Sequence, residues 1–221
     1  MHLLIARHGE TRWNVERRIQ GWGDSPLTEI GRNQARQLAM RLGDIRLSAV
    51  YSSDLGRAIE TAKIIVGDRS LPVVRLPDLR ETSWGKWEGM TAAEIQAVEP
   101  DLWAQFTARG REFNESEDET DWEASTVVPD GETLTAAASR ISSALTLIRS
   151  QHPRDDDWVM VVGHGGSLRF FVTLALGLPP RRIRRLHMDN ASLTHILYLR
   201  GHPPIIKCLN DTGHHDVSAT K

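Results

Sequence analysis

Two histidines of this sequence lie in glycine-containing turns, each directly after an apolar run. His8 follows the run at residues 3–6 and has Arg7 before it, and His164 follows the run at residues 158–162. A neutral imidazole can attack phosphorus when a hydrogen bond holds the proton on its other ring nitrogen. The rigid donors of an arginine match the oxygens of a phosphate group. Two such histidines with an arginine indicate chemistry on a phosphate monoester.

A second arginine and a carboxylate are expected at the same place. Arg57 lies on the first turn of a helix that should follow the apolar run at residues 47–51, and Glu81 follows the apolar pair at residues 73–74. In doubly wound α/β sheets, functional groups gather just beyond the carboxyl ends of the strands. A carboxylic acid beside a phosphate dianion can hold the proton that a leaving alcohol needs.

These side chains require a scaffold of strands and helices, and apolar runs alternate with helical patterns along most of the chain. Strands are expected at residues 3–6, 47–51, 73–74, 158–162, 193–199 and 205–209. Helices are expected at residues 28–42, 55–66, 134–148 and 167–176, with Thr28 and Ser53 as caps of the first two. Continuous apolar strands flanked by helices predict an α/β fold, in which a mostly parallel sheet forms the middle of a three-layer α/β/α sandwich. We expect one such domain over residues 1–221.

The segment at about residues 91–128 is expected to be a small helical cap inserted into this domain. Thr91 and Glu94 form a capping box, which starts a helix, and a second amphipathic stretch follows Pro100. Residues 115–121 are mostly acidic, and like charges repel and stay solvated. They are expected to form an exposed loop at the tip of the insertion.

The composition excludes several classes of function. The 27 lysines and arginines against 29 aspartates and glutamates give a net charge of −2, whereas a nucleic-acid coat or a membrane-surface protein carries excess positive charge. The single cysteine, Cys208, cannot form an internal disulfide, which fits a reducing compartment. No signal peptide and no apolar run long enough to span a membrane is recognisable. We expect a cytoplasmic protein that binds a small molecule, with no nucleic-acid or membrane partner.

Several different short motifs that contain glycine, histidine, arginine or acidic residues are distributed along the chain. In order they are Leu4-Ile5-Ala6-Arg7-His8-Gly9-Glu10-Thr11, Asn14, Gln20-Gly21, Asp24-Ser25-Pro26-Leu27-Thr28-Glu29-Ile30-Gly31, Tyr51-Ser52-Ser53-Asp54-Leu55-Gly56-Arg57-Ala58, Leu79-Arg80-Glu81, Gly85-Lys86-Trp87-Glu88-Gly89, Pro129-Asp130-Gly131-Glu132 and Gly163-His164-Gly165-Gly166. In this order and at these spacings they resemble the histidine phosphatase superfamily, also called the phosphoglycerate mutase-like family. The resemblance runs through most of the chain.

The resemblance implies a role for each matching residue. His8 would be the nucleophile that becomes phosphohistidine, and Glu81 would be the general acid and then the base that activates water. Arg7, Arg57 and His164 would bind the transferring phosphoryl group, with Asn14 assisting unless it only caps the local turn. Gln20 and Gly21 would contact the phosphate or its leaving group. The resemblance implies no metal and no organic cofactor.

Departures from the family pattern favour a metal-independent phosphatase. Phosphoglycerate mutases that depend on bisphosphoglycerate usually carry threonine at the position of Gln20 and a longer insertion, so the mutase is the alternative enzyme. A non-catalytic module that binds a phosphorylated ligand is the alternative of another class, and the presence of both His8 and Glu81 argues against it. The leaving alcohol and the oligomeric state stay open. Aromatic side chains are candidate walls of the leaving-group pocket: Trp22, Trp84, Trp103, Phe106 and Trp122.

Overall fold

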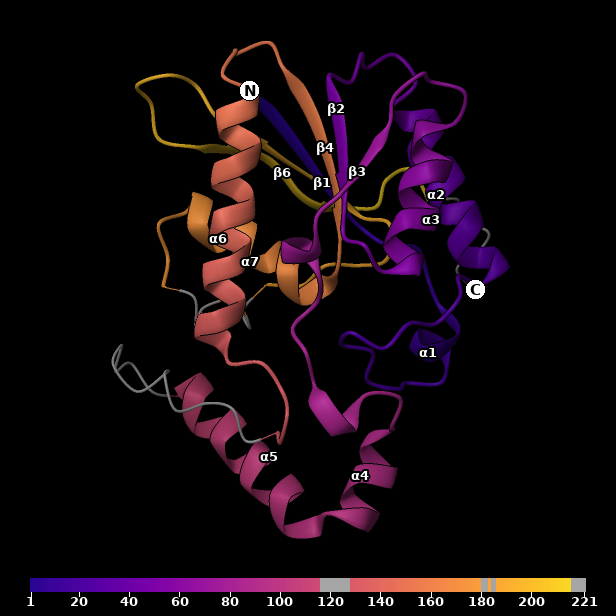
Figure 1. Cartoon of the computed structure of the whole chain (residues 1–221), viewed down its shortest axis with the longest axis vertical. Helices are drawn as coiled ribbons and strands as arrows, with labels where there is room; N and C mark the ends of the chain where they lie inside the picture. Colours follow the sequence, from indigo (N-terminus) through magenta and orange to yellow (C-terminus); the bar gives the residue numbers. More distant parts are fainter. Residues whose placement is uncertain (116–127, 180–182, 184–185, 216–221) are drawn as a thin grey trace.

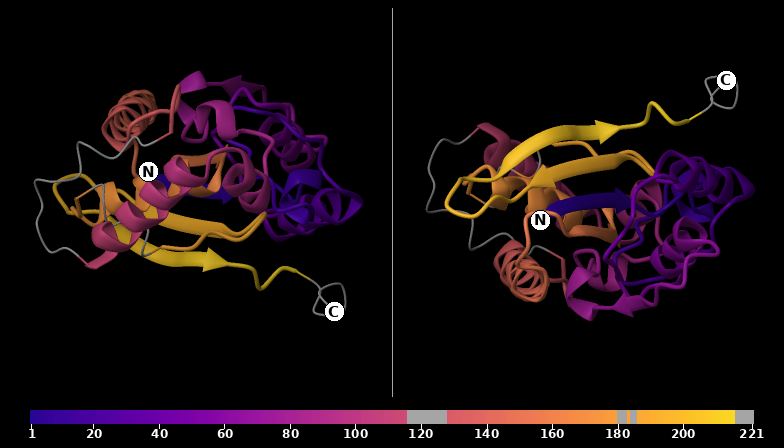
Figure 2. Two further views of the ribbon diagram at one scale, coloured as in Figure 1. Left: turned by 90° about the horizontal axis from the view of Figure 1, so that it is seen from below. Right: turned by 90° about the horizontal axis from the view of Figure 1, so that it is seen from above.

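The structure is a computed structural model that describes residues 1–115, 128–179, 183 and 186–215 (Figure 1). Its centre is a sheet of six strands in the order β3-β2-β4-β1-β5-β6. The strands are β1 (His2–Arg7), β2 (Ala49–Ser52), β3 (Val73–Arg75), β4 (Trp158–Gly163), β5 (Leu193–Leu197) and β6 (Ile205–Asp211). The first four are parallel neighbours, β5 runs antiparallel to both β1 and β6, and Figure 2 shows β6 at one edge. The predicted α/β fold with a mostly parallel sheet is therefore confirmed.

Helices cover both faces of the sheet (Figure 1). Helices α2 (Glu29–Arg41) and α3 (Gly56–Val66) pack on one face, and α6 (Leu134–Gln151) and α7 (Gly165–Ala175) pack on the other. Alternate residues of β1 divide between the two cores: Leu4 faces α2 and α3, and Leu3 faces α6 and α7. The alternation follows from the two-residue period of a strand, so a continuous apolar run is what a strand covered on both faces needs.

The cap lies beyond the carboxyl ends of the parallel strands (Figure 1). It contains α4 (Ala92–Val98) and α5 (Pro100–Glu115), and the predicted capping box of Thr91 and Glu94 starts α4. A separate small core of Trp87, Ile95 and Val128 holds it together. The aromatic rings of Trp103 and Phe106 pack against Trp87 with centroids 5.8 and 5.2 Å away. Most of the acidic segment at residues 115–121 lies outside the described residues.

The prediction that Ser53 caps α3 is wrong. The Ser53 hydroxyl accepts from the N–H of Leu55, outside the helix, at 3.3 Å. The carboxylate of Asp24 accepts from the first N–H groups of α3 instead, those of Gly56 at 2.6 Å and Arg57 at 3.3 Å. Helix α7 likewise begins two residues before the expected Ser167, because His164 stands at its cap position.

Candidate active site

Strand pairing brings the two predicted histidines together. Strands β1 and β4 pair in register so that Arg7 lies opposite Gly163, and the next residues are His8 and His164. The N–H of His8 donates to the carbonyl of Gly163 at 2.9 Å, and the imidazole centroids are 5.3 Å apart. Both side chains are buried, with 2% of His8 and none of His164 exposed.

The His8 ring is held in one tautomer. Its Nδ1 lies 2.7 Å from the carbonyl oxygen of Gly9. A carbonyl can only accept, so the proton sits on Nδ1 and the lone pair of Nε2 is left for another partner. Burial, and then the positive charges of Arg57 and Arg7, hold the pKa of His8 well below its ordinary value. The imidazole is therefore neutral at physiological pH, as a nucleophile must be.

Burial followed by the charge of Arg57 also lowers the pKa of His164 well below the ordinary value of 6.5. Below about that pH the unfolded chain binds a proton at this position and the folded chain resists it, so the free energy of unfolding falls as the pH falls. Urea unfolding of the wild type should therefore lose more stability between about pH 7 and about pH 5 than that of His164→Gln. Equal losses in the two proteins would show that His164 is not the group responsible.

Two arginines lie beside the histidines, and each is oriented by backbone carbonyls. Arg7 donates from Nη1 to Met188 at 2.8 Å, and Arg57 donates from Nη1 to Gly23 at 2.7 Å and from Nη2 to Gly21 at 2.8 Å. Burial lowers the pKa of both guanidinium groups, which nonetheless stay charged.

Buried polar atoms without a hydrogen-bond partner concentrate here among the described residues: Nε of Arg7 and of Arg57, both ring nitrogens of His164, and Oε1 of Gln20. A buried polar atom without a hydrogen bond lowers the stability of the fold, unless a ligand supplies the missing bond. The arginine and histidine atoms include donors suited to the oxygens of an anion. Rotation of the Gln20 amide would offer its Nε2 as a further donor. This arrangement fits a phosphate group.

The carboxylate of Glu81 is fixed beside this group. Its Oε2 accepts from the N–H of Gly166 at 2.8 Å, and its Oε1 accepts from the N–H of Thr82 at 2.8 Å. A Cβ on Gly166 would lie 2.1 Å from Glu81 Oε1, so a larger residue there would displace the Glu81 carboxylate. The charge of Glu81 acts on both arginines and raises their pKa against the larger effect of burial.

Two further predicted residues, Asn14 and Gly21, also stabilise the local structure. Thr11 caps the short helix α1 (Arg12–Val15), and Asn14 completes the capping box: its Oδ1 accepts from the N–H of Thr11 at 3.0 Å and lies 3.3 Å from Asn190 Nδ2. The Nδ2 of Asn14 has no acceptor among the described residues, so it can still donate to a ligand. Gly21 has a φ of 55°, in the left-handed region that favours glycine. Its carbonyl orients Arg57, as described above.

Three residues that support the site were not predicted from the sequence. Glu88 accepts from the N–H groups of Trp22 at 2.9 Å and Gly23 at 2.6 Å, so it clamps the loop that carries Gln20 and Gly21. Asp24 contacts Arg57 at 3.1 Å besides capping its helix. Arg140 of α6 donates to the carbonyl of Glu81 at 2.8 Å.

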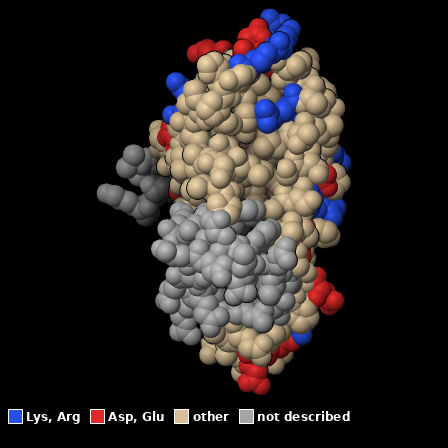
Figure 3. All heavy atoms as spheres, turned by 90° about the vertical axis from the view of Figure 1, so that its left-hand side faces the viewer, with Lys and Arg blue, Asp and Glu red and all other residues tan. Residues whose placement is uncertain are grey.

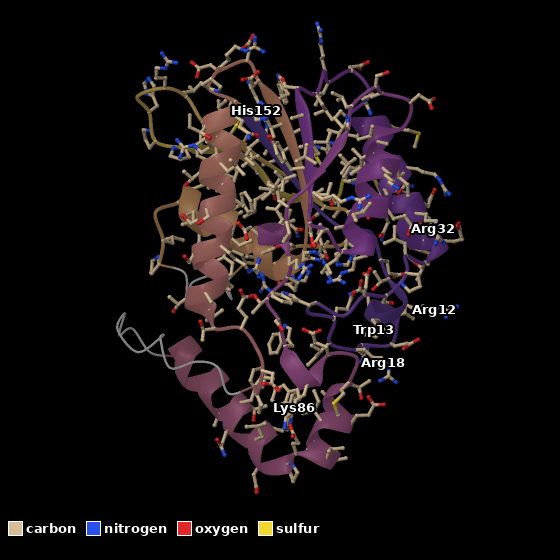
Figure 4. The ribbon with its side chains drawn as sticks, in the orientation of Figure 1. Arg12, Trp13, Arg18, Arg32, Lys86 and His152 are labelled. Carbon is tan, nitrogen blue, oxygen red and sulfur yellow. The ribbon has the colours of Figure 1, made fainter. Side chains whose placement is uncertain are left out.

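Side chains of the segment that follows β1 connect this segment to the cap. Trp13 packs against Gly23, and Arg18 donates to the carbonyl of Gly89 at 2.8 Å and to Glu94 at 2.6 Å. Figure 4 places Trp13 and Arg18 on the loop beside the cap, and His152 near the opposite end of the sheet. The candidate site therefore lies between the strand ends and the cap, among loops that side chains tie to one another.

A cavity of about 290 Å³ opens beside Glu81. Of the aromatic residues expected to form its walls, Trp84 and Phe106 line it. Trp103 packs within the cap core, and Trp22 is 42% exposed and donates from Nε1 to the carbonyl of Glu81 at 2.8 Å. Trp122 lies outside the described residues.

Within the described part of the chain, no three His, Cys, Asp or Glu side chains are grouped to hold a metal ion. None of the helices described there is long and apolar enough to cross a membrane. On the face in Figure 3, side chains of Asp and Glu are visible on the described part of the cap end.

Comparison with known proteins places this geometry in context. A family model described as the histidine phosphatase superfamily (branch 1) matches residues 3–212. A probable phosphoglycerate mutase GpmB of Yersinia pestis is 34% identical, over 99% of this chain and 97% of the relative. Among solved structures, YhfR of Bacillus stearothermophilus has a TM-score of 0.80 at 34% identity, covering 96% of this chain and 98% of that chain. A mycobacterial glucosyl-3-phosphoglycerate phosphatase in complex with VO3 has a TM-score of 0.77 at 30% identity, covering 95% and 98%.

Proposed function

The chain belongs to branch 1 of the histidine phosphatase superfamily, and we propose that it is a metal-independent phosphomonoesterase acting on a small phosphorylated metabolite through a phosphohistidine at His8. The observation that carries this proposal is the buried group of unpartnered donors around a neutral imidazole whose Nε2 is free. It supports an anion bound next to a nucleophile. A non-catalytic binding module would need neither the oriented His8 nor the anchored Glu81.

In the first step, Nε2 of His8 attacks phosphorus while the bond from phosphorus to the ester oxygen breaks. Arg7, Arg57 and His164 hold the equatorial oxygens, where charge is spread in the transition state. Glu81, which takes up a proton when the phosphate dianion binds beside it, gives that proton to the departing oxygen, so the alcohol leaves neutral. The proton stays on Nδ1 of His8 and is donated to the carbonyl of Gly9, which stabilises the cationic phosphoimidazole.

In the second step, water attacks the phosphohistidine from the side that the alcohol has left. Glu81, now a carboxylate, takes a proton from that water as the bond from phosphorus to Nε2 breaks. The products are inorganic phosphate, neutral His8 and protonated Glu81, so the site returns to its starting state. One carboxyl group serves both steps because the alcohol and the water use the same place.

The name of the Yersinia relative favours a second candidate, a phosphoglycerate mutase. A mutase must bind a second phosphorylated acid and return the phosphoryl group to it. The cavity beside Glu81 instead has apolar walls that include Trp84, Phe106 and Leu134. Apolar walls offer no hydrogen bonds to a highly charged bisphosphate, but they suit an alcohol with a largely apolar body. This supports hydrolysis over the mutase reaction.

Phosphatase assays with a metal chelator test the proposal. We expect the purified protein to hydrolyse p-nitrophenyl phosphate at the same rate with and without EDTA, because its own arginines and histidines supply the positive charge and the nucleophile. A coupled assay with phosphoglycerate and bisphosphoglycerate tests the alternative. Efficient isomerisation with negligible hydrolysis would identify a mutase, and loss of hydrolysis in EDTA would contradict metal independence.

A further inference from the structure

Two carboxylates, those of Glu81 and Glu132, and one guanidinium, that of Arg169, line the cavity beside Glu81. Arg169 of α7 lines it and is half-buried, and within the described residues it forms no ion pair. Of the two carboxylates, Glu132 is paired with Arg140 of α6, which donates to both of its oxygens at 2.7 Å. The remaining walls include the apolar side chains of Trp84 and Phe106.

The guanidinium of Arg169 is held in place. Its Nε donates to the carbonyl of Gly165 at 2.8 Å, and its Nη1 lies 3.5 Å from the carbonyl of Leu186. Nη2 has no acceptor among the described residues. A guanidinium that is already oriented loses little conformational entropy when it binds an anion. Arg169 is therefore ready to donate to a ligand.

Arg169 and the proposed general acid, Glu81, are each held by the backbone of one of two consecutive glycines. Glu81 accepts from the N–H of Gly166, and Arg169 donates to the carbonyl of Gly165. Glu81 would meet the ester oxygen of the substrate, so Arg169 would meet a part of the alcohol farther from phosphorus. With Glu81 protonated as the proposed acid and Glu132 paired with Arg140, a neutral alcohol would leave Arg169 without a counterion among the described residues.

We propose that the alcohol of the substrate carries an anionic group, such as a carboxylate, on an otherwise apolar body, and that Arg169 determines this specificity. The inference rests on the proposed phosphatase function, whose leaving-group site it describes. The apolar body would lie against Trp84 and Phe106. The carboxylate would receive hydrogen bonds from Nη2 of Arg169, which are strong because both partners are charged.

Two synthetic esters of equal shape test this inference: the phosphate esters of p-hydroxyphenylacetate and of p-hydroxyphenylacetamide. They differ only in whether the remote group is a carboxylate or a neutral amide. We expect kcat/KM of the wild type to be at least about tenfold higher for the carboxylate ester. In Arg169→Gln this ratio should fall toward about one, and Arg169→Lys, which keeps the charge without the planar fork, should retain part of it. Arg200→Gln, at an exposed turn, should keep the wild-type ratio.

Three results would overturn the inference. A wild-type ratio near one would show that the site has no preference for an anion. A high ratio that survives in Arg169→Gln would place the recognition elsewhere. A parallel loss for both esters in Arg169→Gln would mean that Arg169 acts on the phosphoryl group alone. The ratio of kcat/KM values for the two esters in the wild type tests the preference for an anion, and this test does not depend on whether a variant folds.

Binding to the His8→Ala variant separates this inference from the phosphatase proposal, because no phosphohistidine can form there. Calorimetric dissociation constants should favour the carboxylate ester over the amide by the same factor of about ten. A preference in binding without hydrolysis by the wild type would contradict only the phosphatase proposal. Hydrolysis of both esters without any preference would contradict only the role of Arg169.

Discussion

Replacing His8 by alanine is expected to lower kcat for p-nitrophenyl phosphate by at least about 10⁴-fold, because the substitution removes the nucleophile itself. The structure leaves no obvious substitute. His164 is fully buried beside His8, but neither of its ring nitrogens has a partner among the described residues that would fix its tautomer. In the proposed mechanism it can bind the phosphoryl group but is not prepared to attack it.

Trapping the intermediate makes this prediction specific. Wild-type protein given a labelled phosphate ester and quenched in alkali should retain label, since phosphohistidine survives base, and His8→Ala should retain none. His202→Ala is the matched control, because His202 lies exposed on a turn outside the site. Urea unfolding of each variant reports whether the fold is intact. Near-normal turnover in a folded His8→Ala protein would exclude the phosphohistidine mechanism.

The elements and the candidate residues of the site were predictable from local signals. The apolar run of β1, the arginine and histidine that follow it, and the glycines around His164 all lie within a few neighbouring residues. Once the sheet is parallel, the ends of β1 and β4 must meet at one edge. The structure places Arg57 and Glu81 at that edge as well, since their charges act on each other there.

The supporting contacts were not predictable, because they join residues far apart in sequence. Asp24 caps a helix that begins at Gly56, while the nearer Ser53 bonds outside the helix. Arg140 lies on an amphipathic helix, where an arginine usually points to solvent, and only the packing of α6 brings it to the carbonyl of Glu81. Glu88 lies in a glycine-containing motif a few residues after Glu81, and only its acceptor contacts show that it holds a loop.

The antiparallel direction of β5 is another feature that the sequence pattern could not predict. Its apolar run resembles that of a parallel strand, because both lie in the covered part of the sheet. Direction depends on where the preceding chain returns to the sheet, here after α7. The two-residue period of a strand carries no information on this point.

Replacing Glu81 by glutamine should separate the two chemical steps. The amide cannot protonate a leaving alcohol, so turnover of an alkyl phosphate should fall by about 10²- to 10⁴-fold. Nitrophenolate leaves without a proton, so the first step should stay fast with p-nitrophenyl phosphate. The second step still needs a base for water. This variant should therefore release about one nitrophenolate per site in a rapid burst and then turn over slowly.

Stopped-flow absorbance measures the burst, and alkyl phosphate hydrolysis measures the leaving-group effect. Glu29→Gln, at an exposed position on α2, is the matched control and should show neither change. Glutamine has one carbonyl oxygen, so it cannot accept from both Gly166 and Thr82 as Glu81 does, and urea unfolding should accompany the kinetics. Equal losses for both substrates without a burst would mean that Glu81 shapes the site rather than moving protons. A burst confined to p-nitrophenyl phosphate would instead show one carboxyl group acting first as acid and then as base.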